Sequence, residues 1–242
     1  MDWLHYIEKI FLFDKEAPLI FTRFYFWAFF AIVLFFYGFI HSSKNKTIRS
    51  AYLFLVSLFF YWKSSGFFFF ILIFSTVTDY HLGKMIYHSK SELRAKLLVA
   101  TSIFVNLMVL IYFKYAGFFT DAFNQMAGTQ FESINYLAMW SNDGLGTHFT
   151  VDKILLPVGI SFYTFQTISY SIDVYRKEVK PVNNLIDFGF YVSFFPQLVA
   201  GPIVRARQFI PQLYENYNVT RAEFGLAIFW ILKGLVKKVF IG

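Results

Sequence analysis

Long apolar runs separated by short polar segments dominate the chain. Six runs carry no charged residue, at positions 24–40, 50–62, 64–78, 97–113, 154–172 and 188–204. A seventh begins at Phe224 and is interrupted by Lys233, Lys237 and Lys238. A helix needs about 20 mostly apolar residues to cross a bilayer, and most runs reach that length once flanking aromatic and basic residues sit among the headgroups. The pattern predicts an all-helical membrane protein that crosses the bilayer several times.

We expect one membrane domain over residues 1–242, with spans at about 20–40, 48–63, 66–83, 97–116, 154–175, 186–204 and 222–242. The run at 50–62 is short, so it is either a half-span or one arm of a tight hairpin. Before the spans, apolar residues recur at helical spacing, which predicts an amphipathic helix over 1–14 on the membrane surface. This start lacks the basic segment and small-residue cleavage site of a signal peptide.

The distribution of basic residues predicts the orientation. Lys and Arg follow the first, third and fifth spans, whereas the segment 117–152 has none and carries four acidic residues. Basic loops stay in the cytoplasm, so we expect an outside N-terminus and an outside segment 117–152. After Asp187 the rule is ambiguous, because Arg205, Arg207 and Arg221 follow the sixth run.

Composition narrows the chemistry. Hydrophobic residues make up 57% of the chain and charged residues 15%, well below the quarter that is usual in soluble domains. The net charge of +7 falls in the loops between spans, so it does not indicate a nucleic-acid partner. The absence of cysteine excludes thiol catalysis and thiolate metal sites. No metal-binding spacing links the histidines, which all lie in polar, loop-like surroundings: His5, His41, His81, His88 and His148.

The fifth run carries a polar face. Tyr163, Gln166, Tyr170 and Asp173 repeat at helical spacing. This face either packs against neighbouring helices, with its polar atoms bonded across them, or lines a polar cavity or tunnel. Asp173 and Arg176 are three residues apart, so they can pair at the membrane boundary.

The sixth run contains the stretch FFPQLVAGPIVR, which is broken twice, at Pro196 and at Gly201-Pro202. A residue before proline is biased away from helical dihedrals, so we expect non-helical backbone here. Such backbone survives at membrane depth only when protein covers it or it faces water. Gln197 and Arg205 flank the break, and Arg205 either holds an anionic group or extends to the headgroups.

Two long motifs carry a resemblance to a known family. The stretches LLPVGISFYTFQTISYSIDVYR and FGFYVSFFPQLVAGPIVRARQFIPQL resemble the membrane-bound O-acyltransferase family, in its alginate O-acetyltransferase-like branch. The resemblance implies helices, some broken or re-entrant, around a tunnel in a bacterial cytoplasmic membrane. It implies no bound cofactor, an activated acyl donor such as acetyl-CoA, and transfer to an extracytoplasmic polysaccharide, directly or through a partner acyltransferase.

The resemblance also implies site residues. Five polar or charged residues of the matching motifs are candidates for the substrate-binding tunnel wall: Gln166, Asp173, Arg176, Gln197 and Arg205. No catalytic residue is expected among them, and no metal site.

The family's catalytic histidine lies in a later apolar stretch, and none of the five histidines here matches it. By this resemblance we expect the catalytic histidine beyond Gly242, so that the chain is an N-terminal fragment that is inactive alone. Without the resemblance, a polytopic transporter or a membrane scaffold subunit fits the same apolar pattern, although scarce intramembrane charge weakens the transporter.

Overall fold

The computed structural model describes residues 24–41, 45–145, 151, 154, 156–198, 201–215 and 219–240, and all regular structure among them is helical. The surface helix expected over 1–14 lies outside these residues. Two continuous helical stretches are long and apolar enough to cross a membrane, Lys46–Tyr87 and Glu92–Ala127. The prediction of a helical membrane protein is thereby confirmed.

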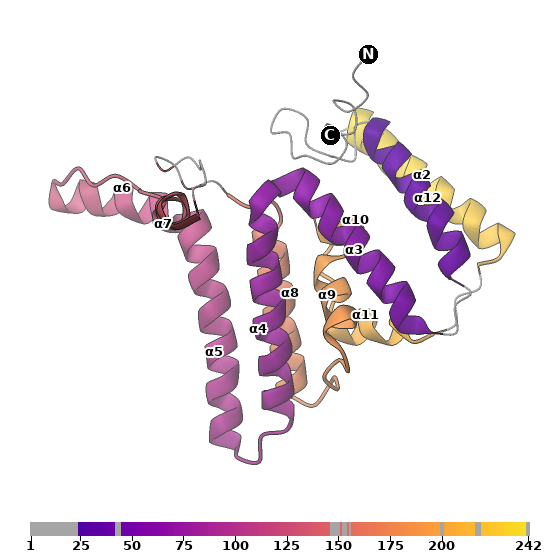
Figure 1. Ribbon diagram of the computed structural model, residues 1–242, viewed down its shortest axis with the longest axis horizontal. Helices are drawn as coiled ribbons and strands as arrows, with labels where there is room; N and C mark the ends of the chain where they lie inside the picture. The colour runs from indigo at the N-terminus through magenta and orange to yellow at the C-terminus, as the bar shows by residue number, and fades with distance from the viewer. Residues whose placement is uncertain are drawn as a thin grey trace.

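The first described helices form an elbow. α2 (Phe24–Ile40) carries no charge, and α3 (Lys46–Ser65) begins where the side chain of Asn45 accepts a hydrogen bond from the Thr47 amide at 3.0 Å. α3 ends at Gly66, whose φ of 60° suits a residue without a side chain. A short 3-10 turn, η1 (Gly66–Phe68), leads into α4 (Phe69–Tyr87), so α3 and α4 meet at an angle (Figure 1).

The next stretch runs along α4 and then turns away. α5 (Glu92–Leu110) begins at Ser91, whose hydroxyl accepts from the Arg94 amide. It continues into a π-helix, η2 (Ile111–Tyr115), and then into α6 (Ala116–Ala127). Figure 1 shows α6 and α7 (Tyr136–Leu145) lying across the end of α5 instead of extending its axis.

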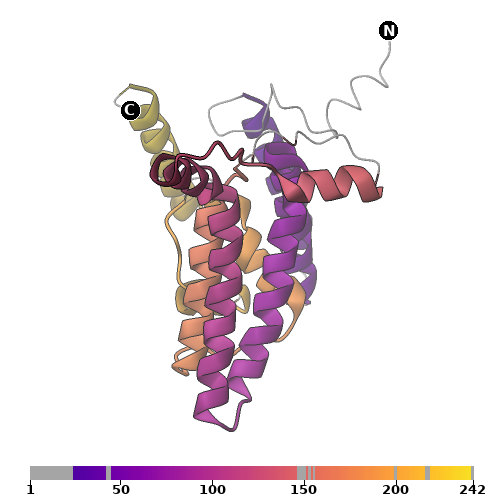
Figure 2. The ribbon, with the colours of Figure 1, turned by 90° about the vertical axis from the view of Figure 1, so that its left-hand side faces the viewer.

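The second half of the chain returns to this group. α8 (Ile160–Tyr175) packs against α4 and α5, and both views show the three helices side by side (Figure 1, Figure 2). α9 (Leu185–Ser193) packs along α3. The short helices α10 (Phe195–Leu198) and α11 (Ala206–Leu213) follow, and α12 (Arg221–Phe240) is exposed along nearly all its described length.

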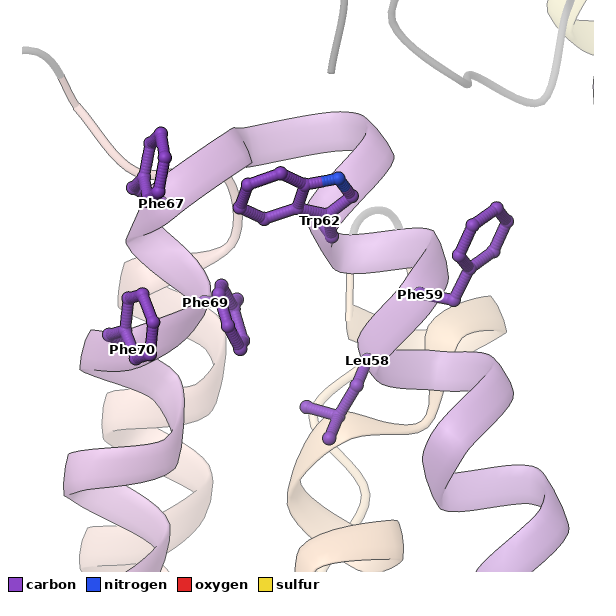
Figure 3. A pocket seen from close by; sticks show the side chains of 6 residues that line it. All are labelled: Leu58, Phe59, Trp62, Phe67, Phe69 and Phe70. Carbon is purple, nitrogen blue, oxygen red and sulfur yellow. The ribbon is translucent and has the colours of Figure 1, made fainter. Parts of the chain in front are cut away.

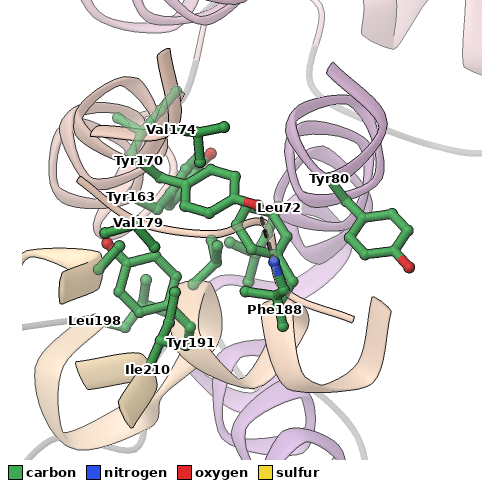
Figure 4. Close-up of a cluster of buried hydrophobic side chains, with 14 of the residues drawn as sticks. Leu72, Tyr80, Tyr163, Tyr170, Val174, Val179, Phe188, Tyr191, Leu198 and Ile210 are labelled. Atoms are coloured by element: carbon green, nitrogen blue, oxygen red, sulfur yellow. Dashed lines mark hydrogen bonds between the residues drawn. The ribbon is translucent and has the colours of Figure 1, made fainter. Parts of the chain in front are cut away.

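An aromatic core joins these helices. Its fully buried rings come from α3, α8 and α9: Tyr61, Tyr163, Tyr170, Phe188 and Tyr191. Figure 4 shows the rings of α8 and α9 converging. Gly83 of α4 lies so close to α8 that a Cβ atom there would be 2.6 Å from the Tyr170 ring. The approach of α4 to α8 therefore depends on the missing side chain.

Candidate functional site

The segment from α9 to α11 enters the helix group and leaves at the same end. Asp187 lies at the start of this segment and Tyr214 at its end. The Tyr214 hydroxyl donates a hydrogen bond to the Asp187 carboxylate at 2.8 Å. Arg207 also pairs with Glu178, which precedes α9, at 3.5 Å. α9 has nine residues, about half of what a span needs. The geometry is that of a re-entrant hairpin instead of the single span expected over about 186–204, although the break in the helix agrees with the expected broken helices.

Proline and glycine explain why this helix breaks. α9 stops at Phe194, whose φ of −49° and ψ of 108° are not helical, and Pro196 lies in the first turn of α10, where a missing amide hydrogen costs nothing. Gly201 then packs on the backbone of α10, where an added Cβ would lie 2.6 Å from the Gln197 Cα. Residues 201–205 are non-helical. The predicted irregular backbone around Gly201-Pro202 is confirmed.

The tip of the hairpin lies in the protein interior. The Phe195 ring is 1% exposed and packs with Phe26 and Phe60, and its amide donates to the Ser57 hydroxyl at 3.3 Å. Gln197 is 9% exposed, and its Nε2 has no hydrogen-bond partner among the described residues. The Ser193 hydroxyl, also buried, is likewise without a partner there. An unpaired buried polar group costs about 1–3 kcal/mol, so such atoms mark places where a ligand or water can bind.

The polar face of α8 contacts this hairpin. Gln166 is 2% exposed, and its Nε2 donates to the Tyr191 carbonyl of α9 at 2.7 Å. The Tyr170 hydroxyl accepts from the Val182 amide at 3.4 Å (Figure 4). The Tyr163 hydroxyl is buried without a hydrogen-bond partner in the described chain. This face of α8 therefore carries both polar atoms that are hydrogen-bonded to neighbouring segments and polar atoms without a partner in the described chain.

A close backbone contact fixes the start of α8 against the hairpin. Gly159 has a φ of 73°, and an added Cβ there would lie 2.5 Å from the Leu198 carbonyl oxygen. Glycine meets both demands, the positive φ and the lack of space. The Tyr61 hydroxyl of α3 donates to the neighbouring Val158 carbonyl at 2.8 Å. α3, α8 and α10 thus meet at this point.

A buried carboxylate links α4, α5 and α8. Asp79 is fully buried, and its two oxygens accept hydrogen bonds from the Ser102 hydroxyl at 2.6 Å and the Asn106 amide at 2.7 Å. Thr167 of α8 donates to Asn106 at 3.0 Å, and Ser171 bonds Ser102 at 2.9 Å. The sequence does not single out Asp79, because this residue directly follows a charge-free run, where a charged residue is expected to flank a span. The structure places it in the middle of α4.

The basic end of the helix group holds the other predicted site residues. Asp173 is 4% exposed, and its Oδ2 has no hydrogen-bond partner among the described residues. No ion pair with Arg176 forms within 4 Å in this part of the chain; the carboxylate instead interacts at longer range with Arg205, Arg207 and Arg176. Arg176 and Arg205 are exposed. The structure thus gathers Asp173, Arg176 and Arg205 at the end of the helix group where α8 ends, while Gln166 and Gln197 lie in its interior.

The end of α11 is held against the start of α3 at this same end of the helix group. Lys46 donates to the Tyr214 carbonyl, and Arg49 to the carbonyls of Leu213 and Glu215. Cations at the last carbonyls of a helix interact favourably with its dipole. Burial and the neighbouring Asp187 carboxylate raise the pKa of the Tyr214 phenol, so it is protonated at neutral pH and donates to Asp187. These contacts hold the hairpin closed at its base.

Other candidates carry little chemistry. An apolar cleft of about 490 Å³ lies in the elbow of α3 and α4, lined by Leu58, Phe59, Trp62, Phe67, Phe69 and Phe70 (Figure 3). No group of three metal-ligating side chains occurs among the described residues.

The histidines of the described chain do not reach the hairpin. His41, His81 and His88 are exposed and lie outside the hairpin region. The catalytic histidine expected beyond Gly242 falls outside the described residues, which end at Phe240, so its position stays a prediction.

Comparison with known proteins identifies relatives for most of the chain. It is 36% identical to a probable alginate O-acetylase AlgI of Pseudomonas aeruginosa, over 82% of this chain and 35% of that protein. It is 37% identical to the probable AlgI of Azotobacter vinelandii, over 69% of this chain and 30% of the relative. A peptidoglycan O-acetyltransferase of Helicobacter pylori is 28% identical, over 82% of this chain and 39% of its own length.

These alignments leave much of each relative unmatched. The chain spans about a third of the length of these curated relatives. No family model and no solved structure matches it.

Proposed function

Because the chain belongs to the membrane-bound O-acyltransferase family, we propose that the protein it forms transfers an acetyl group to hydroxyls of an extracytoplasmic polysaccharide. The observation that carries this proposal is the match to alginate O-acetylases over 82% of the chain. The relatives are named for alginate and for peptidoglycan, so the proposal extends to the shared class of acceptor, a polymer with sugar hydroxyls. The bacterial cytoplasmic membrane, crossed several times, is the proposed location.

The reaction requires a base that the described residues do not supply. Transfer from a thioester such as acetyl-CoA breaks the carbonyl–sulfur bond and forms a carbonyl–oxygen bond to the sugar. The hydroxyl proton passes to a base, and the thiolate that leaves takes up a proton. Histidine suits this role at neutral pH, but the described histidines are exposed and lie away from the hairpin. We propose that the base comes from a part of the protein beyond Gly242, so the chain purified alone transfers no acetyl group.

The re-entrant hairpin supports a role as one wall of the reaction path. It brings Gln197 into the interior with an unpaired amide, next to a helix that presents Gln166 and an unpaired Tyr163 hydroxyl. Amide and phenol groups can donate hydrogen bonds to an acyl carbonyl oxygen. At the end of the helix group where α8 ends, Arg176 and Arg205 are exposed, and guanidinium groups bind phosphate well, as a donor such as acetyl-CoA would need.

The test measures acetyl esters on the extracellular polysaccharide of cells that express the full-length protein. Deleting the gene should abolish the esters, and the wild-type gene should restore them. Gln197→Leu is expected to lower ester content by at least about tenfold, the equivalent of about 1.4 kcal/mol, while the protein level in the membrane stays unchanged. Gln208→Leu, a matched change at an exposed position of α11, should behave like wild type.

The outcomes separate two claims. If deletion leaves the acetyl content of every surface polymer unchanged, the proposed activity is wrong. If deletion abolishes the esters but Gln197→Leu restores them as well as wild type does, the activity stands and Gln197 has no part in it.

A further inference from the structure

α6 has two chemically distinct faces. With 3.6 residues per turn, the apolar residues fall on one side of the helix: Phe118, Phe119, Ala122, Phe123 and Met126. The polar residues fall on the opposite side: Thr120, Asp121, Asn124 and Gln125. No residue of α6 is buried, and Met126 is 88% exposed. The described chain therefore leaves most of an apolar helix face uncovered.

The polar face carries the segment that follows. The Asn124 Oδ1 accepts from the Phe131 amide and from the Thr129 hydroxyl, both at 2.9 Å, and its Nδ2 donates to the Phe131 carbonyl at 2.8 Å. In Figure 1 this returning segment runs along the side of α6 that faces away from the rest of the helices. The Phe131 ring also lies 5.9 Å from the Phe123 ring, so this segment covers one edge of the apolar face and leaves Phe119 and Met126 exposed.

The bend between α5 and α6 has the composition of a membrane interface. The π-helix ends the apolar stretch of α5, and its Lys114 lies 5.3 Å from the Tyr115 ring and 3.4 Å from the Ser161 hydroxyl. The Tyr112 hydroxyl donates to the Asn135 side chain at 3.1 Å, which anchors the start of α7, and Trp140 of α7 is 71% exposed. Tyr, Trp and Lys gather at the ends of membrane helices, where a polar tip meets water and the body meets lipid.

We infer that α6 lies in the plane of the membrane, at the boundary between headgroups and acyl chains of the leaflet in which α5 ends. Its occupant is the phospholipid bilayer: Phe119 and Met126 insert among acyl chains, and Asp121 and Gln125 face water. Apolar side chains are exposed along α5 as well, among them Phe104 at 61% and Met108 at 43%, as expected of a helix that faces acyl chains. In this position α6 determines how deep in the bilayer the end of α5 and the adjacent start of α8 lie. The inference is independent of acetyl transfer.

The natural absence of cysteine allows a direct test. Single cysteines at Phe119, Met126, Asp121 and Gln125 are spin-labelled, and the chain is reconstituted in vesicles of phosphatidylcholine and phosphatidylglycerol. Power saturation measures collision with oxygen, which concentrates in lipid, and with a water-soluble nickel chelate. The oxygen-to-nickel accessibility ratio should be severalfold higher at positions 119 and 126 than at 121 and 125. A label at Phe104 serves as the lipid-facing reference.

Two results would overturn the inference. Equal ratios at all four positions would mean that α6 does not lie at the interface. Labels at positions 119 and 126 that are shielded from both reagents would mean that protein, not lipid, covers the apolar face.

Discussion

Single buried polar residues in this protein fall into two groups. Asp79 and Gln166 have their hydrogen bonds completed by neighbouring helices, so they hold the helices together. Gln197 and Tyr163 are also buried, at 9% and 0% exposed, but each has a donor without a partner in the described chain. Because leaving such a group unpaired is costly, the first group should govern stability and the second group should govern binding.

The Asp79 cluster gives the sharpest stability prediction. Asp79→Ala removes one hydrogen bond from Ser102 and one from Asn106, and each lost hydrogen bond costs about 0.5–1.5 kcal/mol. Both donors keep a second partner, the Ser171 hydroxyl for Ser102 and the Ser102 carbonyl for Asn106. We expect a clear fall in the free energy of unfolding, measured by denaturant titration in detergent. Asp79→Asn, which keeps one acceptor, should lose less.

The matched control for this series lies on α6. Asp121 is exposed and has no hydrogen bond or ion pair among the described residues, so Asp121→Ala should change the free energy of unfolding by less than about 0.5 kcal/mol. If Asp79→Ala and Asp121→Ala were equally stable, the cluster would not hold α4, α5 and α8 together.

At the scale of elements, the contact between α4 and α8 depends on one glycine. Gly83→Ala would place a methyl group 2.6 Å from the fully buried Tyr170 ring. Overpacking of this kind costs about 1–3 kcal/mol, so we expect a lower melting temperature. Gly38→Ala on α2 meets nothing within 4 Å and should be neutral or stabilising, because alanine favours helix over glycine by about 0.5–1 kcal/mol. Similar melting temperatures for both variants would contradict the close α4–α8 contact.

The apolar runs predicted where helices occur better than where each helix begins and ends, since the run at 64–78 covers the end of α3, η1 and the start of α4. The charge-free run at 24–40 coincides with α2, and the run at 50–62 lies within α3. The break near Pro196 was predictable from the fixed dihedral of proline. α6 was missed as an amphipathic helix, because its 12 residues are too few for a span and follow an apolar run directly. The role of Asp79 was also missed, because only tertiary contacts supply its partners.

At the scale of the whole molecule, the re-entrant hairpin decides where the chain goes after α8. The basic residues after Asp187 made the orientation ambiguous, since Arg205 and Arg207 lie beyond a run long enough to span. The structure places Arg207 beside Glu178, which closely follows Arg176. The arginines before and after the hairpin therefore lie at the same end of the helix group. Sequence could not show this, because a half-span that returns and a full span share the same apolar composition.

This arrangement predicts which positions share a side of the membrane. Single cysteines at Lys90, Asp143 and Gln208, all exposed, are treated in intact cells with an impermeant thiol reagent. Positive-inside orientation places Lys90 in the cytoplasm, and the hairpin places Gln208 with it, so only Asp143→Cys should be labelled. After permeabilisation all three should react, which controls for access. Labelling of Lys90→Cys and Gln208→Cys without Asp143→Cys would invert the orientation but keep the hairpin. Labelling of Asp143→Cys and Gln208→Cys together would show that residues 185–213 cross the membrane, because a returning segment cannot place position 208 opposite position 90.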